Sequence, residues 1–155
     1  MHGNIYEISQ YVIDIEDQAR EDELFDEKIM KYVIEHDEDD RNQAINMMLN
    51  SQWFSSLFKA GSDKNTIVFM GGVSNLIEQW HQSIQKELNK MIDKKSTNTW
   101  GIREAINCPF RTADLFCLPD YSGVQAVPQR TFVEWLETLE PGTELCINAV
   151  FDYKF

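Results

Sequence analysis

Basic residues are scarce in this chain of 155 residues. Fourteen lysines and arginines stand against 26 aspartates and glutamates, which gives a formal net charge of −12. Nucleic acids and anionic membranes are bound through neutralised phosphates or lipid charges. The charge therefore argues against direct binding to nucleic acid or to a membrane, and it favours a cationic partner.

Cysteine is rare as well. Cys108, Cys117 and Cys146 are odd in number and form no CxxC pair, which excludes a disulfide framework. We expect reduced thiols that serve as small core residues.

Long hydrophobic runs are also lacking. No purely apolar run exceeds the four residues of Ile67 to Met70, far too few to span a bilayer. The first ten residues, MHGNIYEISQ, have neither the basic nor the apolar segment of a signal peptide. We therefore expect a cytoplasmic protein.

Catalytic and cofactor motifs are missing too. The stretch MGGVSN, residues 70 to 75, places two glycines between an expected strand and an expected helix, where anions often bind, but it lacks a nucleotide-binding pattern. Acids in the loop that begins at Asp37 do not follow the EF-hand spacing, and the single ExxH pair, Glu78 and His81, has no second copy. We predict no cofactor and no metal.

What the chain does contain is ample core material, with 43% hydrophobic residues and 18 aromatic ones. Its patterns predict a single α+β domain over residues 1–155, with helices dominating the first two-thirds and a small, mostly antiparallel sheet that includes the C-terminal strand. Expected strands lie within 4–15, where helix is the alternative, and at 66–70, 115–118, 123–127 and 143–153. Expected helices span 21–36, 40–60 with a break at Asn50 and Ser51, 75–94, 99–107 and 128–139.

Acidic residues are concentrated near the start. Residues 1–41 hold 14 acids and four bases, and the stretch VIEHDEDDRNQ, residues 33–43, contains four consecutive acids. Asp39 or Asp40 is expected to cap the helix that begins near Arg41. One carboxylate is enough to cap a helix, so capping does not explain the other acids.

The acids that capping does not explain suggest a docking surface for a basic protein. Immunity proteins, antitoxins and nucleic-acid-mimicking inhibitors share this charge asymmetry, which is a likeness of class only. Carboxylates would steer the encounter, and Trp53 or Tyr32 would anchor the complex. The predicted partner-binding residues are Asp17, Glu21, Asp22, Glu23, Asp26, Glu27, Asp37, Glu38, Asp39 and Asp40.

Three alternatives remain open. The acids can simply form a solvated face that aids solubility. A small enzyme can assemble a site from Gly71, Gly72 and Ser74 together with the series Glu134, Glu137 and Glu140. A structural subunit or homodimer can form if the expected helix with Lys86, Lys90, Lys94 and Lys95 meets the acidic region of a second copy.

Overall fold

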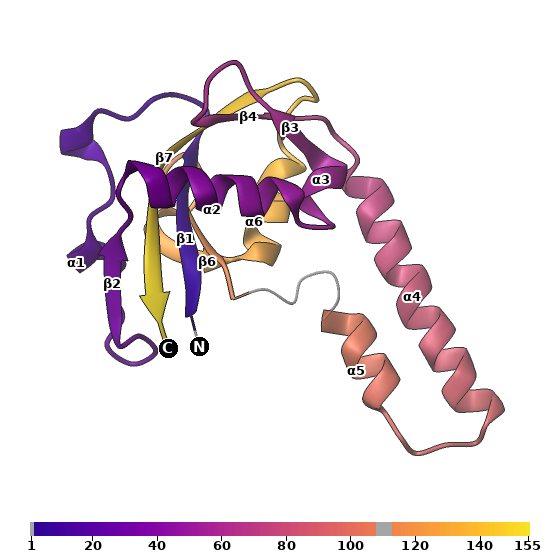
Figure 1. Cartoon of the computed structure of the whole chain (residues 1–155). Coiled ribbons are helices and arrows are strands. Elements are labelled where there is room, and N and C mark those ends of the chain that lie inside the picture. The colour runs from indigo at the N-terminus through magenta and orange to yellow at the C-terminus, as the bar shows by residue number, and fades with distance from the viewer. Residues whose placement is uncertain (1, 108–112) are drawn as a thin grey trace. The chain divides into compact units, whose positions relative to one another are not determined.

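The computed structural model describes residues 2–107 and 113–155 (Figure 1). Contacts divide the chain into two compact units, one formed by Met1–Gly71 with Thr112–Phe155 and the other by Gly72–Arg111. Among the described residues, no helix has the length and apolar character needed to cross a membrane. The expectation of one domain over the whole chain stays a prediction.

In the described part of the first unit, seven strands form one mixed sheet. They are β1 (His2–Ser9), β2 (Tyr32–Glu35), β3 (Phe58–Ala60), β4 (Thr66–Phe69), β5 (Leu115–Leu118), β6 (Gly123–Pro128) and β7 (Glu144–Lys154). The order is β3-β4-β7-β1-β5-β6, and β2 also pairs with β7. Only β1 and β5 run parallel among these pairs. The α+β class is confirmed, but the sheet is large rather than small, and the first two-thirds of the chain supply four of its strands.

Strand β7 organises the sheet because it is long enough to pair along both edges. One edge takes β1, while the other takes β4 near its start and β2 near its end. Both β1 and β7 are buried almost throughout, so the sheet is covered on both faces.

Aromatic side chains fill the core on one face, beneath α2 (Glu38–Asn50), α3 (Phe54–Leu57) and α6 (Gln129–Leu136). Phe132 of α6 stacks on Phe116 of β5 with ring centroids 4.3 Å apart, and Phe54 of α3 contacts both rings. Tyr6 of β1 donates a hydrogen bond to the carbonyl of Ala44, which ties α2 to this face.

The opposite face is covered by the acidic segment that includes η1 (Ile15–Asp17) and α1 (Glu21–Leu24). Ala19, Leu24 and Met30 are buried there against Ile5 and Cys117 of the sheet. The segment is thus amphipathic without being one continuous helix.

The helix predicted over 21–36 is wrong. After the four residues of α1 the chain turns, and Tyr32–Glu35 forms β2 instead. Phe25 and Ile29, expected on the buried face, are 42% and 57% exposed. Backbone pairing with the free edge of β7 overrides the helical spacing, and it also removes unfavourable like-charge pairs such as Glu23 and Glu27.

Most other predicted elements are confirmed with small shifts of their ends. The break at Asn50 and Ser51 is present, although Phe58–Ala60 is a strand and not helix. The cap of α2 is Asp37, whose side chain accepts from the Asp40 backbone N–H, rather than Asp39 or Asp40.

Cys117 and Cys146 are free thiols, and Cys108 lies outside the described residues.

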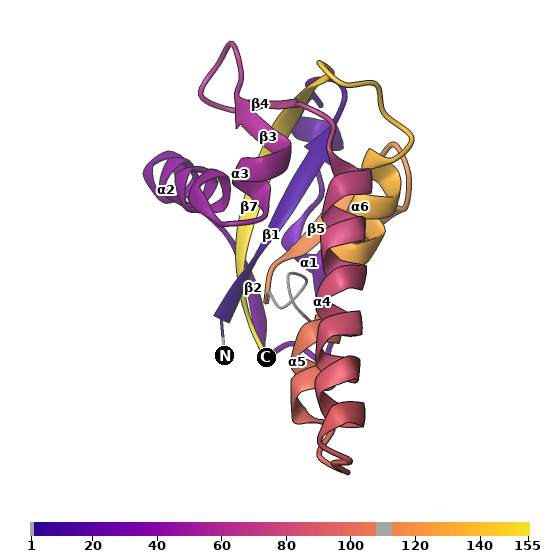
Figure 2. The ribbon, with the colours of Figure 1, turned by 90° about the vertical axis from the view of Figure 1, so that its right-hand side faces the viewer.

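The second unit is a hairpin of α4 (Val73–Asp93) and α5 (Trp100–Asn107) (Figure 2). Trp80 Nε1 lies 3.0 Å from the Ala105 carbonyl, which links the two helices. Helix α4 begins directly after Gly72, whose φ is positive at 95°, so the helix starts two residues before the predicted position 75.

Candidate functional site

All ten predicted partner-binding acids are exposed, and they come from η1, α1, the turn before β2 and the start of α2. They are Asp17, Glu21, Asp22, Glu23, Asp26, Glu27, Asp37, Glu38, Asp39 and Asp40. Each of these segments lies in the first unit.

A bulge in the central strands fixes the acidic segment to the sheet. The register between β1 and β7 shifts after Glu7, so Asn148 of β7 lies opposite no residue of β1. The freed Asn148 side chain accepts from the Ile13 backbone N–H at 2.9 Å and donates to Ser9 Oγ at 2.7 Å. Because these groups are buried, each bond also satisfies a polar atom that water cannot reach.

Glu7 makes the second attachment. Its Oε2 accepts a 2.6 Å hydrogen bond from the Ala19 backbone N–H, while Oε1 is buried without a hydrogen-bond partner among the described residues. Burial raises the pKa of Glu7, and the carboxylates of Glu35 and Glu23 add to that rise, against the opposing effect of the Ala19 bond.

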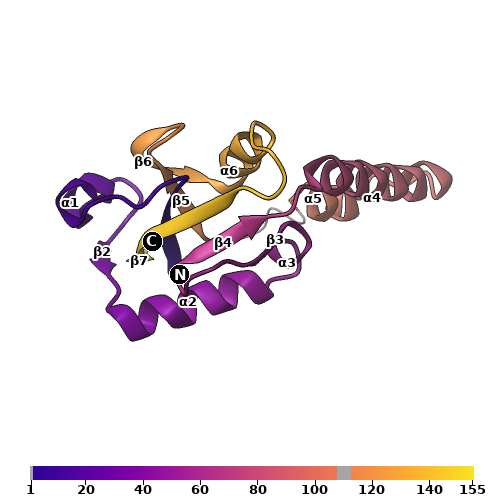
Figure 3. The same ribbon diagram turned by 90° about the horizontal axis from the view of Figure 1, so that it is seen from above.

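Most of the predicted acids lie in two groups, one at η1 and α1 and the other at the start of α2, and β2 joins them. Glu21 Oε1 accepts from the Glu35 backbone N–H at 2.8 Å, and Glu21, Asp22 and Glu35 line one hollow of about 340 Å³. Asp37 follows Glu35 by two residues and starts α2. Figure 1 places α1 beside β2, which leads into α2, and Figure 3 shows α1 and α2 on opposite sides of β2.

We define the acidic surface by nine residues. They are Asp17, Glu21, Asp22, Glu23, Glu35, Asp37, Glu38, Asp39 and Asp40. Glu35 was missed by the sequence reasoning, because that reasoning placed it inside a helix. Asp26 and Glu27 lie in the turn at the other end of β2, so the structure separates them from the rest.

Folding uses only part of the acidic surface. Asp37 caps α2, Glu21 binds the Glu35 N–H, and Glu23 accepts from the Arg20 N–H at 3.0 Å. Glu38 pairs with Lys64, and Arg20 lies 3.5 Å from Asp22. These pairs are exposed and contribute about 0–1 kcal/mol each.

Four acids make no local side-chain bond among the described residues. Within the described residues, the side chains of Asp17, Glu27, Asp39 and Asp40 make no hydrogen bond and no ion pair. Three of them belong to the acidic surface.

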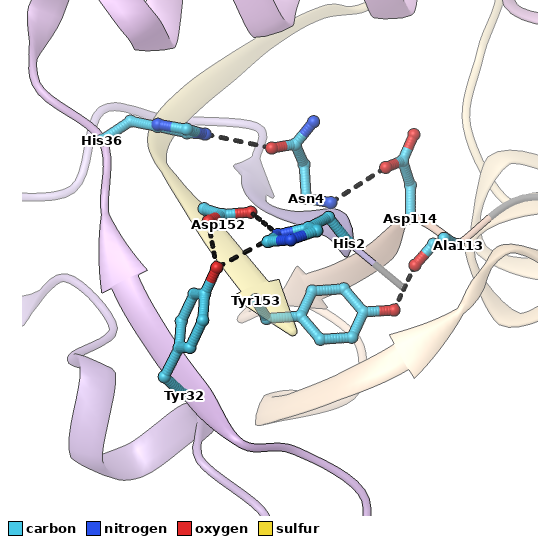
Figure 4. Close-up of polar contacts among 8 residues, drawn as sticks. All are labelled: His2, Asn4, Tyr32, His36, Ala113, Asp114, Asp152 and Tyr153. Carbon is cyan, nitrogen blue, oxygen red and sulfur yellow. Dashed lines mark hydrogen bonds and ion pairs between the residues drawn. The ribbon is translucent and has the colours of Figure 1, made fainter. Parts of the chain in front are cut away.

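A second group of polar side chains lies where β1, β5 and β7 come together, and sequence reasoning missed it entirely (Figure 4). Asn4 pairs with Asp152 in the sheet register, and its backbone N–H donates to Asp114 Oδ1 at 3.0 Å. Asp114, which directly precedes β5, therefore forms one row with Asn4 of β1 and Asp152 of β7, which we call the polar row. The three residues lie far apart in the sequence, so no local sequence pattern predicts that they come together.

Two histidines and a tyrosine adjoin the polar row. His36 Nε2 lies 3.0 Å from Asn4 Oδ1, and His2 Nδ1 lies 3.5 Å from Asp152 Oδ1. Tyr32 donates a 3.1 Å hydrogen bond to Asp152 Oδ2. His36 directly follows β2, and His2 begins β1.

Tyrosines near the row are held in their neutral form. Burial raises the pKa of Tyr153 to about 12, and Asp114 adds to the rise. Burial likewise raises the pKa of Tyr6, again with help from Asp114. The described residues hold no group of three or more metal-ligating side chains.

The residues of the enzyme alternative are divided between the two units, with Ser74 in the second and the three glutamates in the first. Ser74, Glu134, Glu137 and Glu140 are all exposed. Three hollows in the described part of the chain are lined by other residues.

Comparisons with protein-family models, curated proteins and solved structures found no match. The likeness to immunity proteins and antitoxins therefore remains one of charge alone.

Proposed function

We propose that this protein docks a basic protein through the acidic surface. The observation that carries the proposal is the exposure of Asp17, Asp39 and Asp40 without any hydrogen bond or ion pair among the described residues. Clustered like charges repel one another, which offsets part of what Asp39 and Asp40 contribute at the positive end of the α2 dipole. A partner rich in lysine and arginine would relieve that repulsion.

The mechanism is electrostatic steering followed by steric blocking. Exposed carboxylates raise the rate of encounter with a cationic surface, and this effect weakens as salt screens the charges beyond roughly 10 Å. If the partner is a nuclease or another nucleic-acid-binding enzyme, the carboxylates occupy the positions that phosphates normally take.

The aromatic anchors predicted from the sequence need revision. Trp53 is only 7% exposed and packs on Phe54, so it cannot reach a partner. Tyr32 is half-buried and its hydroxyl is bound to Asp152. Ile15 and Ile34 are 86% and 55% exposed and supply apolar area beside the acids instead.

The test compares two triple variants that change the net charge equally. One carries Glu38→Gln, Asp39→Asn and Asp40→Asn. The matched control carries Glu134→Gln in α6 and Glu137→Gln and Glu140→Gln directly after it. A partner is first captured from lysate of the source cells at low salt, eluted with a salt gradient and identified by mass spectrometry. Its purified form is then titrated against both variants by calorimetry.

We expect the α2 variant to bind more weakly than the α6 control and to lose much of its salt dependence. Equal affinities for the two variants would refute docking through the acidic surface. Failure to capture any basic protein would leave solubility as the role of the acids.

Self-association is a second candidate, and the distribution of charge between the two units favours it. Residues 72–111 hold six basic and four acidic residues, whereas the rest of the chain holds eight basic and 22 acidic ones. Lys86, Lys90 and Lys94 are exposed on α4. Sedimentation velocity at low and high salt tests this candidate, because a dimer held by these charges dissociates as salt rises.

A further inference from the structure

The most exposed large hydrophobic side chains of the described residues lie at two places in the chain. Ile15 and Val12, at 86% and 77% exposed, belong to the first unit, and Trp100, at 65% exposed, belongs to the second. A single exposed hydrophobic residue is ordinary on a protein surface, whereas a grouped set marks an interaction site. The surroundings of each place therefore decide whether it has a role in binding.

Ile15 begins η1, a turn that is fixed to the sheet on both sides. Before the turn, Ile13 is buried and its backbone N–H donates to Asn148 at 2.9 Å. After the turn, Ala19 is buried and its backbone N–H donates to Glu7 at 2.6 Å. A side chain that is presented on a fixed turn loses little conformational freedom when it binds, so Ile15 is preorganised for a contact.

Acidic residues flank Ile15 on this turn. The side chains of Asp14, Glu16 and Asp17 are exposed and make no hydrogen bond or ion pair among the described residues. Residues 1–19 contain no lysine or arginine. We define the acidic knob as Val12, Asp14, Ile15, Glu16 and Asp17. Its complement is an apolar recess that is bordered by cations.

A recess of this kind lies between α4 and α5 of the second unit (Figure 1). Its volume is about 310 Å³, at the small end of the range for binding sites, which suits one inserted side chain. Met91, Trp100 and Ile102 form its apolar wall. Gly101 also lines it, and a Cβ there would collide with the Glu87 carboxylate, so the glycine is needed where the helices come close. We call this recess the hairpin hollow.

The border of the hairpin hollow is basic. Lys90 and Lys94 line it, and residues 86–95 hold four lysines against two acids. Lys90 pairs with Glu87 at 2.9 Å, whereas Lys94 and Lys95 are exposed and make no ion pair among the described residues. Lysines also suit the C-terminal end of a helix, but that role does not require an exposed tryptophan beside them.

The connection between the two helices is ordered by its own hydrogen bonds. The Ser96 backbone N–H donates to the Met91 carbonyl at 3.0 Å, and Ser96 Oγ accepts the Asn98 backbone N–H at 3.0 Å. Asn98 Oδ1 in turn accepts the Trp100 backbone N–H at 3.0 Å at the start of α5. The border of the hollow is therefore as well defined as the turn that carries Ile15.

We propose that the hairpin hollow of one molecule receives the acidic knob of a second copy. Ile15 packs against Met91 and Trp100, and the carboxylates of the knob meet Lys94 and Lys95. A second copy is favoured as the occupant because both complementary surfaces occur in this one sequence. Two reciprocal contacts close a dimer, whereas contacts in one direction build an open chain. This inference rests on the self-association candidate of the proposed function and gives that candidate its two surfaces.

The test is sedimentation velocity of the purified full-length protein over a series of concentrations and salt. The knob variant carries Glu16→Lys and Asp17→Lys, and the hollow variant carries Lys94→Glu and Lys95→Glu. We expect the wild type to associate at low salt and each variant alone to associate about tenfold more weakly or less. An equimolar mixture of the two variants should regain association, because each altered surface then meets an oppositely charged one. A mixture that associates no better than the separate variants would overturn the proposal, as would a wild type that stays monomeric throughout.

The apolar part of the contact has its own test. Ile15→Ser is expected to weaken association about tenfold or more, whereas Ile34→Ser, at another exposed isoleucine of the first unit, leaves it unchanged. Amide spectra of the ¹⁵N-labelled variants show whether each fold is intact. In the wild type, dilution should shift amides of residues 12–17 and 90–102, and shifts confined to other residues would contradict the assignment.

Failure of this inference and failure of the proposed function give different results. Neutralised Glu38, Asp39 and Asp40 lie outside the knob, so that variant should associate as the wild type does. If the partner depends on those three acids but the mixture does not associate, docking stands and the knob contact fails. If the mixture associates but the partner tolerates their loss, the knob contact stands and docking through the acidic surface fails. A wild type that associates in the same way as both charge-reversed variants would keep self-association and exclude these two surfaces.

Discussion

Asp37 stabilises the start of α2 through a capping hydrogen bond, and the three acids that follow it make no such bond. Its side chain accepts the Asp40 backbone N–H at 2.9 Å, and its carboxylate lies at the positive end of the helix dipole. Loss of the cap in Asp37→Ala removes about 1 kcal/mol, and loss of the charge at the helix end removes about 0.5 kcal/mol more. Relief of repulsion from the three following acids returns a few tenths of a kcal/mol. We expect a net destabilisation of about 1.2 kcal/mol.

The assay is urea and thermal unfolding followed by circular dichroism. In a chain of this size, about 1.2 kcal/mol corresponds to a fall in Tm of about 2–5 °C. Asp39→Ala is the matched control, because it removes the same charge from a side chain that makes no local bond, and its effect should stay within about 0.5 kcal/mol. Asp37→Ser restores an acceptor and should recover most of the loss.

Two results would refute this reasoning. If Asp39→Ala destabilises the protein as much as Asp37→Ala does, the cap lies where the sequence had placed it. If Asp37→Ser is no more stable than Asp37→Ala, the side-chain hydrogen bond does not contribute.

Three further predictions concern the sheet and its core. Because burial raises the pKa of Glu7 above its ordinary value of 4.5, the folded protein keeps this proton to higher pH than the unfolded chain does, and wild-type stability should fall relative to Glu7→Gln as pH rises through and above 4.5. Urea unfolding of both proteins over a pH series checks the sign, and a relative gain by the wild type would contradict it. Gly3→Ala places a Cβ 2.5 Å from the Ala113 carbonyl oxygen and 2.7 Å from the Tyr153 ring, so it should destabilise the protein by about 1–3 kcal/mol, and a neutral effect in thermal unfolding would refute the close packing. Phe132→Ala removes the ring at the centre of the aromatic core and should cost about 3–5 kcal/mol in urea unfolding, whereas a loss below about 1 kcal/mol would show that the core lies elsewhere.

Elements with one strong period could be predicted from the sequence. The stripe of Ile77, Trp80, Ile84 and Leu88 defines α4, and the alternation of residues 143–153 defines β7. Both patterns agree with the local propensity of their residues, so tertiary structure had nothing to override. The sheet was underestimated because β2 and β3 lie in segments that were predicted as helix, and they become strands by pairing with β7 and β4.

The segment after α1 shows how a plausible pattern fails. Phe25, Ile29, Tyr32 and Val33 have helical spacing, yet only Val33 is fully buried. A helix would have left the end of β7 without a neighbour on that edge, and β2 provides it. The stabilisation comes from backbone hydrogen bonds between β2 and β7. Because β7 lies more than 100 residues later in the sequence, no local sequence window contains both strands.

The sequence by itself determined the α+β class, the positions of the strongly periodic elements and the exposure of the acidic residues, because each follows from composition and local pattern. Tertiary structure alone decided which acid caps α2, that Asp26 and Glu27 separate from the acidic surface, and that Asp114, Asn4 and Asp152 form the polar row. Strand register brings these last three side chains together. Strand register depends on pairing between segments that are distant in the sequence, so it is fixed only when the whole sheet and its core form.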